Sequence, residues 1–172
     1  QRVSAMPVQD TGLVAITRRA AYGDVIGATV IADEVARQGY DVRLNTLPQI
    51  VASKVFQHHR SITSFGGPDD PCHVNLDDTY ERSSLRKTRS AMSLFYEVAV
   101  AQLLRQGIRL RPECNLRPQL RVLPEEVEAA RQMMAPFPRP WIAVIPRSNS
   151  WPNRTVPQEV WSSVAHLVDG TM

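Results

Sequence analysis

The feature that most constrains the fold is an apolar run, a helical pattern and a second apolar run within residues 13–46. Residues 13–17 (LVAIT) have the length and apolarity of a buried strand. Residues 24–38 repeat apolar side chains at helical spacing, and Gly39 follows where a helix commonly ends. Residues 40–46 (YDVRLNT) form a second strand pattern. This order predicts a βαβ unit with parallel strands.

Further patterns continue the alternation of strands and helices. We expect strands at 61–65 and 73–76 and helices at 48–59, 89–106 and 124–135. Strands that alternate with helices of this length predict an α/β fold with a Rossmann-like, doubly wound, mostly parallel sheet. Ligands bind such sheets at the carboxyl ends of the strands. The loops of interest are therefore 18–24, 45–48, 66–71 and 77–88.

A proline-rich stretch, PFPRP at 136–140, predicts a stiff link. Beyond it, residues 141–146 form a fifth strand pattern and residues 157–169 a last helix pattern. One strand and one helix cannot bury their apolar faces alone, so the pair either joins the first sheet or opens a second domain. We expect the second arrangement. Residues 1–138 then form an N-terminal domain with a linker helix, and residues 139–172 begin a C-terminal domain that a missing half or a partner chain completes.

Composition and charge exclude several classes of protein. The chain is 43% hydrophobic and 22% charged, which indicates a soluble globular protein. The net charge is +3, but 18 of the 20 basic residues are Arg and most are scattered singly, which argues against a nucleic-acid-binding stripe.

The spacing of the cysteines, the histidines and the apolar residues predicts no disulfide, no metal site and no membrane span. Cys72 and Cys114 lack metal-ligand spacing, and His58, His59 and His73 lack a third ligand nearby. No apolar run approaches the length of a bilayer. We expect a cytoplasmic protein without a metal ion or cofactor, with peripheral association at the inner face of the membrane left open.

The loop after the first strand, RRAAYGDVIG, holds an acid at the start of a helix. Gly23 suits a tight turn, and the carboxylate of Asp24 can accept backbone N–H groups there and meet the positive end of the helix dipole. Gly23 and Gly27 do not form the GxGxxG pattern of a dinucleotide site. On residue types alone, Asp24 is a helix cap.

Three segments in order resemble glycosyltransferase family 9, the ADP-heptose:lipopolysaccharide heptosyltransferases and their relatives. They are RRAAYGDVIGATVIADEVARQGYDVRLNT, NLDDTYE and RPWIAVIPRSNSWPNRTVPQEVWSSVAHL, and the resemblance extends over residues 13–169. It implies the N-terminal half of a GT-B fold and the start of its nucleotide-sugar domain. It also implies inverting, metal-independent transfer of a sugar, heptose among the candidates, from a donor such as ADP-heptose to a glycan or glycolipid.

In that resemblance Asp24 matches the acid that acts as general base. The role is chemically reasonable, because a sugar hydroxyl is a weak nucleophile until a base within hydrogen-bond reach takes its proton. One carboxylate suffices for inversion. Arg side chains or a helix N-terminus can stabilise the departing diphosphate in place of a metal ion.

The resemblance also assigns residues that contact the donor. A basic residue after the first strand of the second domain contacts the donor phosphates, and the run NRTVP places Arg154 there. Alignment on Trp151 instead would place Ser150 at that position. Ser148 and Asn149 also line the donor loop.

On the acceptor side, the resemblance places Gly23, Asp77, Tyr80 and Glu81 at the cleft. A solvated acidic loop is the alternative interpretation of the last three. The basic residues that follow either contact an anionic acceptor, such as a phosphorylated glycolipid, or pair with those acids. These residues are Arg82, Arg86, Lys87 and Arg89.

The leading hypothesis is therefore a heptosyltransferase-like glycosyltransferase whose residues 1–172 do not transfer sugar alone. A non-catalytic interaction or structural module derived from a GT-B half is the alternative. A nucleotide-binding α/β enzyme of another class is the third hypothesis, which the lack of a glycine-rich phosphate motif weakens.

Overall fold

The computed structural model of the chain describes residues 12–111, 116–137 and 159–160. The chain divides into two compact units, residues 1–123 and residues 124–172. The division precedes α5 (Pro124–Met134), a helix that the sequence analysis placed in the N-terminal domain. The strand and helix expected at 141–146 and 157–169 lie outside the described residues, apart from the helical pair 159–160.

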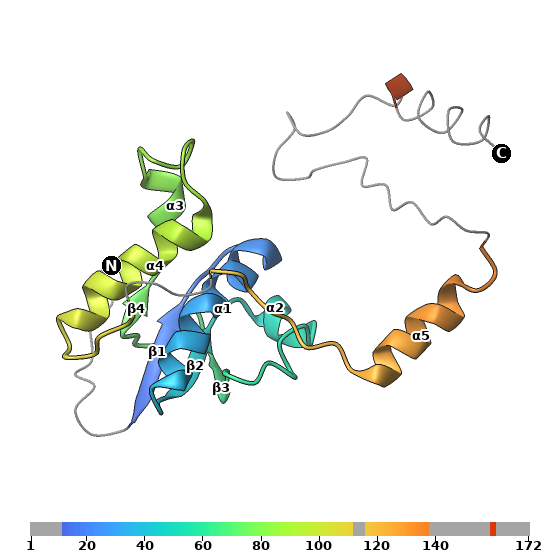
Figure 1. The fold of residues 1–172 in the computed structure, drawn as a ribbon, viewed down its shortest axis with the longest axis horizontal. Helices are drawn as coiled ribbons and strands as arrows, with labels where there is room; N and C mark the ends of the chain where they lie inside the picture. Colours follow the sequence, from blue (N-terminus) through green and yellow to red (C-terminus); the bar gives the residue numbers. More distant parts are fainter. Residues whose placement is uncertain (1–11, 112–115, 138–158, 161–172) are drawn as a thin grey trace. The chain divides into compact units, whose positions relative to one another are not determined.

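A four-stranded, wholly parallel sheet forms the centre of the first unit (Figure 1). Its strands are β1 (Leu13–Thr17), β2 (Asp41–Asn45), β3 (Ser64–Gly66) and β4 (Val74–Asn75), in the order β3-β2-β1-β4. The chain moves outward from β1 to β3 and then crosses to the other side of β1. This is the strand order of a Rossmann-like half, so the predicted α/β, Rossmann-like fold class is confirmed.

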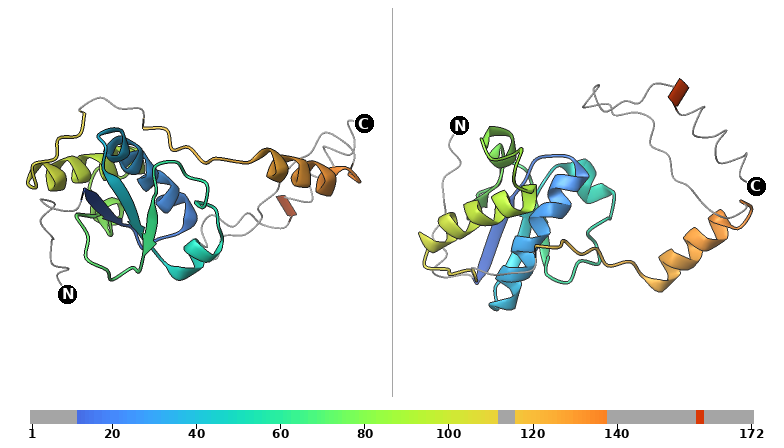
Figure 2. Two further views of the ribbon diagram at one scale, coloured as in Figure 1. Left: turned by 90° about the horizontal axis from the view of Figure 1, so that it is seen from below. Right: turned by 45° about the horizontal axis from the view of Figure 1, so that its top comes forward.

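The helices of the first unit bury the apolar face of the sheet. They are α1 (Tyr22–Arg37), α2 (Pro48–Ala52), α3 (Thr79–Arg82) and α4 (Ala91–Leu104). Helices α1 and α4 pack side by side, as both views of Figure 2 show. The core beneath them contains Val14 and Ile16 of β1, Val42 of β2 and Phe95 of α4, all fully buried. Because side chains alternate along a strand, these apolar positions share one face.

Small and polar side chains form the opposite face of the sheet. Thr17 and Asn45 lie there and are buried. The connection from β3 to β4 passes over them, and Asn45 Nδ2 donates to the carbonyl oxygens of Asp70 and Pro71 at 3.3 Å each. A residue larger than Gly66 at this crossing would displace a neighbouring side chain, because its Cβ would lie 2.2 Å from Asn45 Oδ1.

Several element boundaries differ from the sequence predictions. Helix α2 ends at Ala52 rather than near residue 59, because Ser53 Oγ donates to the Ile50 carbonyl and Lys54 takes a left-handed conformation with φ 60°. The strand expected at 61–65 forms at 64–66. Within the expected polar loop 77–88, residues 79–82 form the short helix α3.

Candidate functional site

The loops at the carboxyl ends of β1 and β4 bring together most of the acidic residues selected from the sequence. These two strands are neighbours in the sheet, and the helices α1 and α4 that follow them pack over the same core. A parallel α/β sheet binds its ligands outside the carboxyl ends of its strands. The candidate site therefore consists of residues 18–24 after β1 and residues 76–82 after β4.

Arg18, which the sequence analysis did not select, is the centre of this site. Its side chain is only 1% exposed and its guanidinium lies 4.8 Å from the ring centroid of Phe95. Nη1 donates to the Leu76 carbonyl at 3.0 Å, and Nη2 donates to Glu81 Oε1 at 2.7 Å. Burial opposes the charge, but the hydrogen bond and charge of Glu81, together with the charges of Asp24 and Asp77, raise the pKa of Arg18 above its ordinary value.

Asp24 lies in the first turn of α1 and does not cap the helix. The helix begins at Tyr22, and Ala21 is its N-cap, without any side-chain cap hydrogen bond. Asp24 is therefore the third helical residue, where its charge still benefits from the helix dipole. Its side chain is 33% exposed, and Oδ1 lies 3.5 Å from Arg18 Nη2. The helix-cap interpretation of Asp24 is wrong because the helix starts two residues earlier than the sequence indicated.

Gly23 occupies the second helical position and is not in the tight turn expected for it. It is absent from the glycines with positive φ, so its backbone suits any residue. A Cβ at Gly23 would meet no described heavy atom within 4 Å. Gly23 therefore leaves open space beside Asp24 at the start of α1.

Glu81 is oriented by Arg18 across the site. Two hydrogen bonds join the groups, Nη2 to Oε1 at 2.7 Å and Nη1 to Oε2 at 3.3 Å. The hydrogen bond from Arg18 lowers the pKa of Glu81 in spite of its partial burial. Arg18 thus holds two carboxylates, those of Asp24 and Glu81, at one edge of the sheet.

Asp77 and Tyr80 make internal contacts in the same loop. Asp77 accepts hydrogen bonds from the Arg19 backbone N–H at 2.6 Å and from Arg19 Nε at 2.5 Å. Tyr80 packs against the main core, and its hydroxyl donates to the Arg86 carbonyl at 3.3 Å. Both residues join the β4 loop to neighbouring segments.

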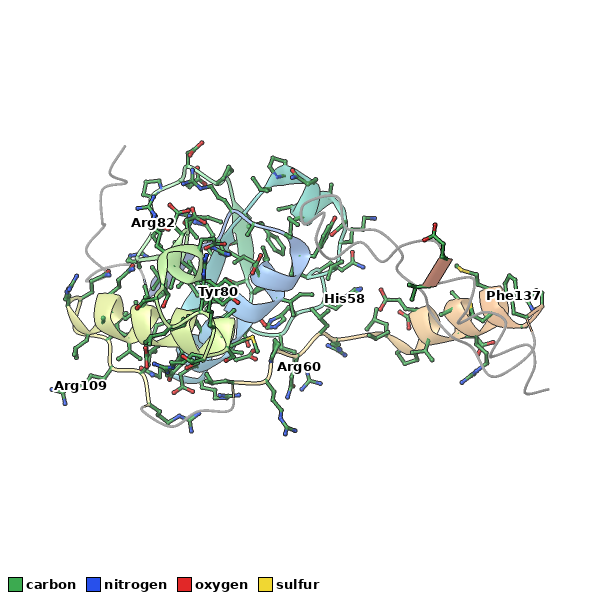
Figure 3. All side chains as sticks on the ribbon, turned by 90° about the horizontal axis from the view of Figure 1, so that it is seen from above. His58, Arg60, Tyr80, Arg82, Arg109 and Phe137 are labelled. Carbon is green, nitrogen blue, oxygen red and sulfur yellow. The ribbon has the colours of Figure 1, made fainter. Side chains whose placement is uncertain are left out.

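The basic residues at the end of α3 and after it mostly pair with acids or backbone carbonyls. Arg82 forms an ion pair with Asp78 at 2.6 Å, Arg86 Nη1 donates to the Glu81 carbonyl at 3.1 Å, and Arg89 pairs with Glu97. Figure 3 labels Tyr80 and Arg82 on this part of the chain. Of the two alternatives for this run, the structure shows pairing with an acid of the same loop for Arg82, through Asp78, whereas Arg89 pairs with Glu97 of α4.

The remaining predicted positions give no site geometry. Ser148, Asn149 and Arg154 lie outside the described residues.

Among the residues that the structure describes, no group of three His, Cys, Asp or Glu side chains could hold a metal ion. No helix in that part of the chain is long and apolar enough to cross a membrane. Cys72 is buried as a free thiol, and burial raises its pKa.

The signal that could have identified Arg18 is its position directly after a buried strand. Side chains there begin the loop at the carboxyl edge, and a basic residue at that point is either exposed or paired.

Comparison of the chain with protein-family models, with curated proteins and with solved structures finds no match.

Proposed function

We propose that this unit is the acceptor side of an inverting, metal-independent glycosyltransferase of GT-B type, with Asp24 as the general base. One observation carries the proposal. Asp24 stands at the carboxyl edge of a parallel sheet, one-third exposed, with the buried Arg18 guanidinium 3.5 Å away. A base needs access to the substrate and a defined orientation, and the exposure of Asp24 and its ion pair with Arg18 support this role.

The surroundings of Asp24 support a role in binding a hydroxylated acceptor. Gly23 leaves open space beside it, so a sugar can approach the first turn of α1. Glu81 lies across Arg18 and offers further carboxylate oxygens, which accept hydrogen bonds from hydroxyl groups. The acceptor hydroxyl would donate its proton to Asp24 as it attacks the anomeric carbon of the donor. The nucleoside diphosphate would depart from the opposite face.

We propose the acceptor and the donor by chemical class only. The donor is a nucleotide sugar, for which ADP-heptose is the first candidate, and the acceptor is a glycan or glycolipid of lipopolysaccharide type. Peripheral association with the inner face of the membrane would follow from a glycolipid acceptor. The donor would be held by Arg154, Ser148 and Asn149 in the second unit.

The test replaces Asp24 with Asn in the gene product at its full encoded length. Asn keeps the size of the side chain but cannot take a proton, so kcat for sugar transfer should fall by about 10²–10⁴. Loss of the dipole interaction and of one ion pair costs about 1 kcal/mol, so the variant stays folded. Transfer is followed by release of nucleoside diphosphate from a panel of nucleotide sugars with glycan acceptors.

Asp41→Asn is the matched control. Asp41 is an exposed acid at the opposite end of the sheet, at the start of β2, and its replacement should leave kcat unchanged. If Asp24→Asn transfers sugar at the wild-type rate, Asp24 is not the base.

A non-catalytic module is the second candidate, because the Arg18 contacts to Glu81 and Asp24 would also stabilise the edge of a domain with no catalytic role. Gly23→Ala separates the two functions. The added methyl group meets no heavy atom of the described residues within 4 Å, and Ala favours a helix by about 0.8–1 kcal/mol over Gly, so the melting temperature should rise. If an acceptor binds in that space, the methyl group of Gly23→Ala would also raise KM for the acceptor. A module without catalytic activity would show only the gain in stability.

A further inference from the structure

The first unit contains a cavity at the opposite end of the strands from Asp24. Its volume is about 610 Å³, within the range of small-molecule sites. The last turns of α1, the loop before β3 and the segment 119–121 line it. The end of α1 leads into β2, so the cavity lies at the amino ends of the strands and is separate from the candidate site.

Positive charge dominates the lining of this cavity. Arg37, Arg60 and Arg121 contribute guanidinium groups. Arg37 Nη1 donates to Glu34 Oε2 at 3.1 Å. Arg60 and Arg121 are exposed, and in the described part of the chain neither forms a hydrogen bond or an ion pair. Two guanidinium forks therefore remain free to bind an anion.

The acid on the lining, Asp33, is already engaged by its neighbours. Its Oδ1 accepts a hydrogen bond from Ser61 Oγ at 2.5 Å and lies 3.9 Å from His59 Nε2. The His59 side chain is only 4% exposed, and its Nδ1 accepts from the Ser61 backbone N–H at 3.3 Å. These contacts hold the side chains of Asp33, His59 and Ser61 in the wall of the cavity.

We propose that this cavity binds the oxyanion of a phosphorylated small molecule through Arg60 and Arg121, with Arg37 as a further donor. Guanidinium groups match phosphate oxygens in pairs and form charge-assisted hydrogen bonds. The volume accommodates the organic part of such a ligand as well as its phosphate. Bound there, the ligand links the loop before β3 to the segment 119–121. The proposal is independent of sugar transfer.

The test measures binding of inorganic pyrophosphate to the full chain by isothermal titration calorimetry at constant ionic strength. The double variant Arg60→Ala/Arg121→Ala should bind at least tenfold more weakly. It should melt within about 2 °C of the wild type, because exposed side chains without partners contribute little to stability.

The matched control is Arg105→Ala/Arg109→Ala, which removes the same charge from exposed positions at and after the end of α4. Figure 3 labels Arg109 and Arg60 at separate places on the unit. The control should retain wild-type affinity. Equal weakening in both double variants would overturn the site, since it would show a response to net charge alone.

A second arm distinguishes a soluble phosphate from a lipid headgroup. The wild-type chain is mixed with phosphatidic acid vesicles and with phosphatidylcholine vesicles, and binding is measured by sedimentation. Pyrophosphate binding without preference for phosphatidic acid is the expected result. Binding to phosphatidic acid vesicles in the absence of any pyrophosphate binding would overturn a soluble ligand.

Discussion

Replacing Glu81 with Gln should destabilise the first unit more than replacing its buried partner Arg18 with Met. The reason is the difference in burial between the two charges. Arg18 is 1% exposed and Glu81 is 47% exposed. Without Glu81 the guanidinium stays buried with a weaker set of acceptors, whereas without Arg18 the carboxylate can be solvated.

The contacts that each substitution removes set the size of its effect on stability. Glu81→Gln loses one of two hydrogen bonds to a charged group and the opposite charge, while Asp24 and the Leu76 carbonyl remain as partners of Arg18. After allowance for solvent screening at Glu81, the cost is about 2 kcal/mol, or roughly 8 °C in melting temperature. Arg18→Met keeps the contact with Phe95, and the Leu76 carbonyl still accepts from Thr79 N–H, so the cost is about 1 kcal/mol or less.

Urea unfolding followed by far-UV circular dichroism measures these differences on the full chain. Hydrogen exchange of the β1 amides assigns the transition to the first unit, since a chain with two units need not unfold in one step. The double variant should resemble Arg18→Met alone, because Glu81 has no buried charge left to satisfy. Additive losses, or a larger loss for Arg18→Met than for Glu81→Gln, would refute this account of the site.

Three further predictions concern the rest of the first unit. Gly66→Ala should lower the free energy of unfolding by about 1–3 kcal/mol in urea denaturation, because its Cβ would lie 2.2 Å from Asn45 Oδ1; a melting temperature equal to wild type would contradict this contact. Burial and the charge of Arg43 lower the pKa of His73, so its contribution to stability is complete above about pH 6.5 and is lost as the pH falls toward the lowered pKa. Urea midpoints at pH 7.5 and 5.5 test it, and His73→Gln should flatten the difference. The hydrogen bond from Arg111 lowers the pKa of Glu34, so its contribution is complete above about pH 4.3 and is lost on further acidification; acid titration of Glu34→Gln should show a shallower loss than wild type.

The sequence was sufficient for the fold class of the first unit because that fold follows from local periodicity. The apolar run of β1, the helical repeat of α1 and the capping Gly39 each act within one segment, and the parallel pairing of β1 with β2 follows from their order. Helix ends were harder to place. The early stop of α2 depends on a side-chain bond from Ser53 and a left-handed Lys54, which no periodic pattern reveals.

The sequence also selected Asp24, Asp77 and Glu81 as acids near the ends of strands. It left a helix cap as the alternative for Asp24 and a solvated acidic loop as the alternative for Asp77 and Glu81. Only the tertiary structure decided that Arg18 lies between Asp24 and Glu81, since the latter contact joins residues 63 positions apart. Local pattern specifies elements, because backbone hydrogen bonds and apolar spacing act over a few residues. Charge pairing across loops depends on how the strands are ordered in space, and Arg18 after β1 reaches Glu81 because β4 is the neighbour of β1.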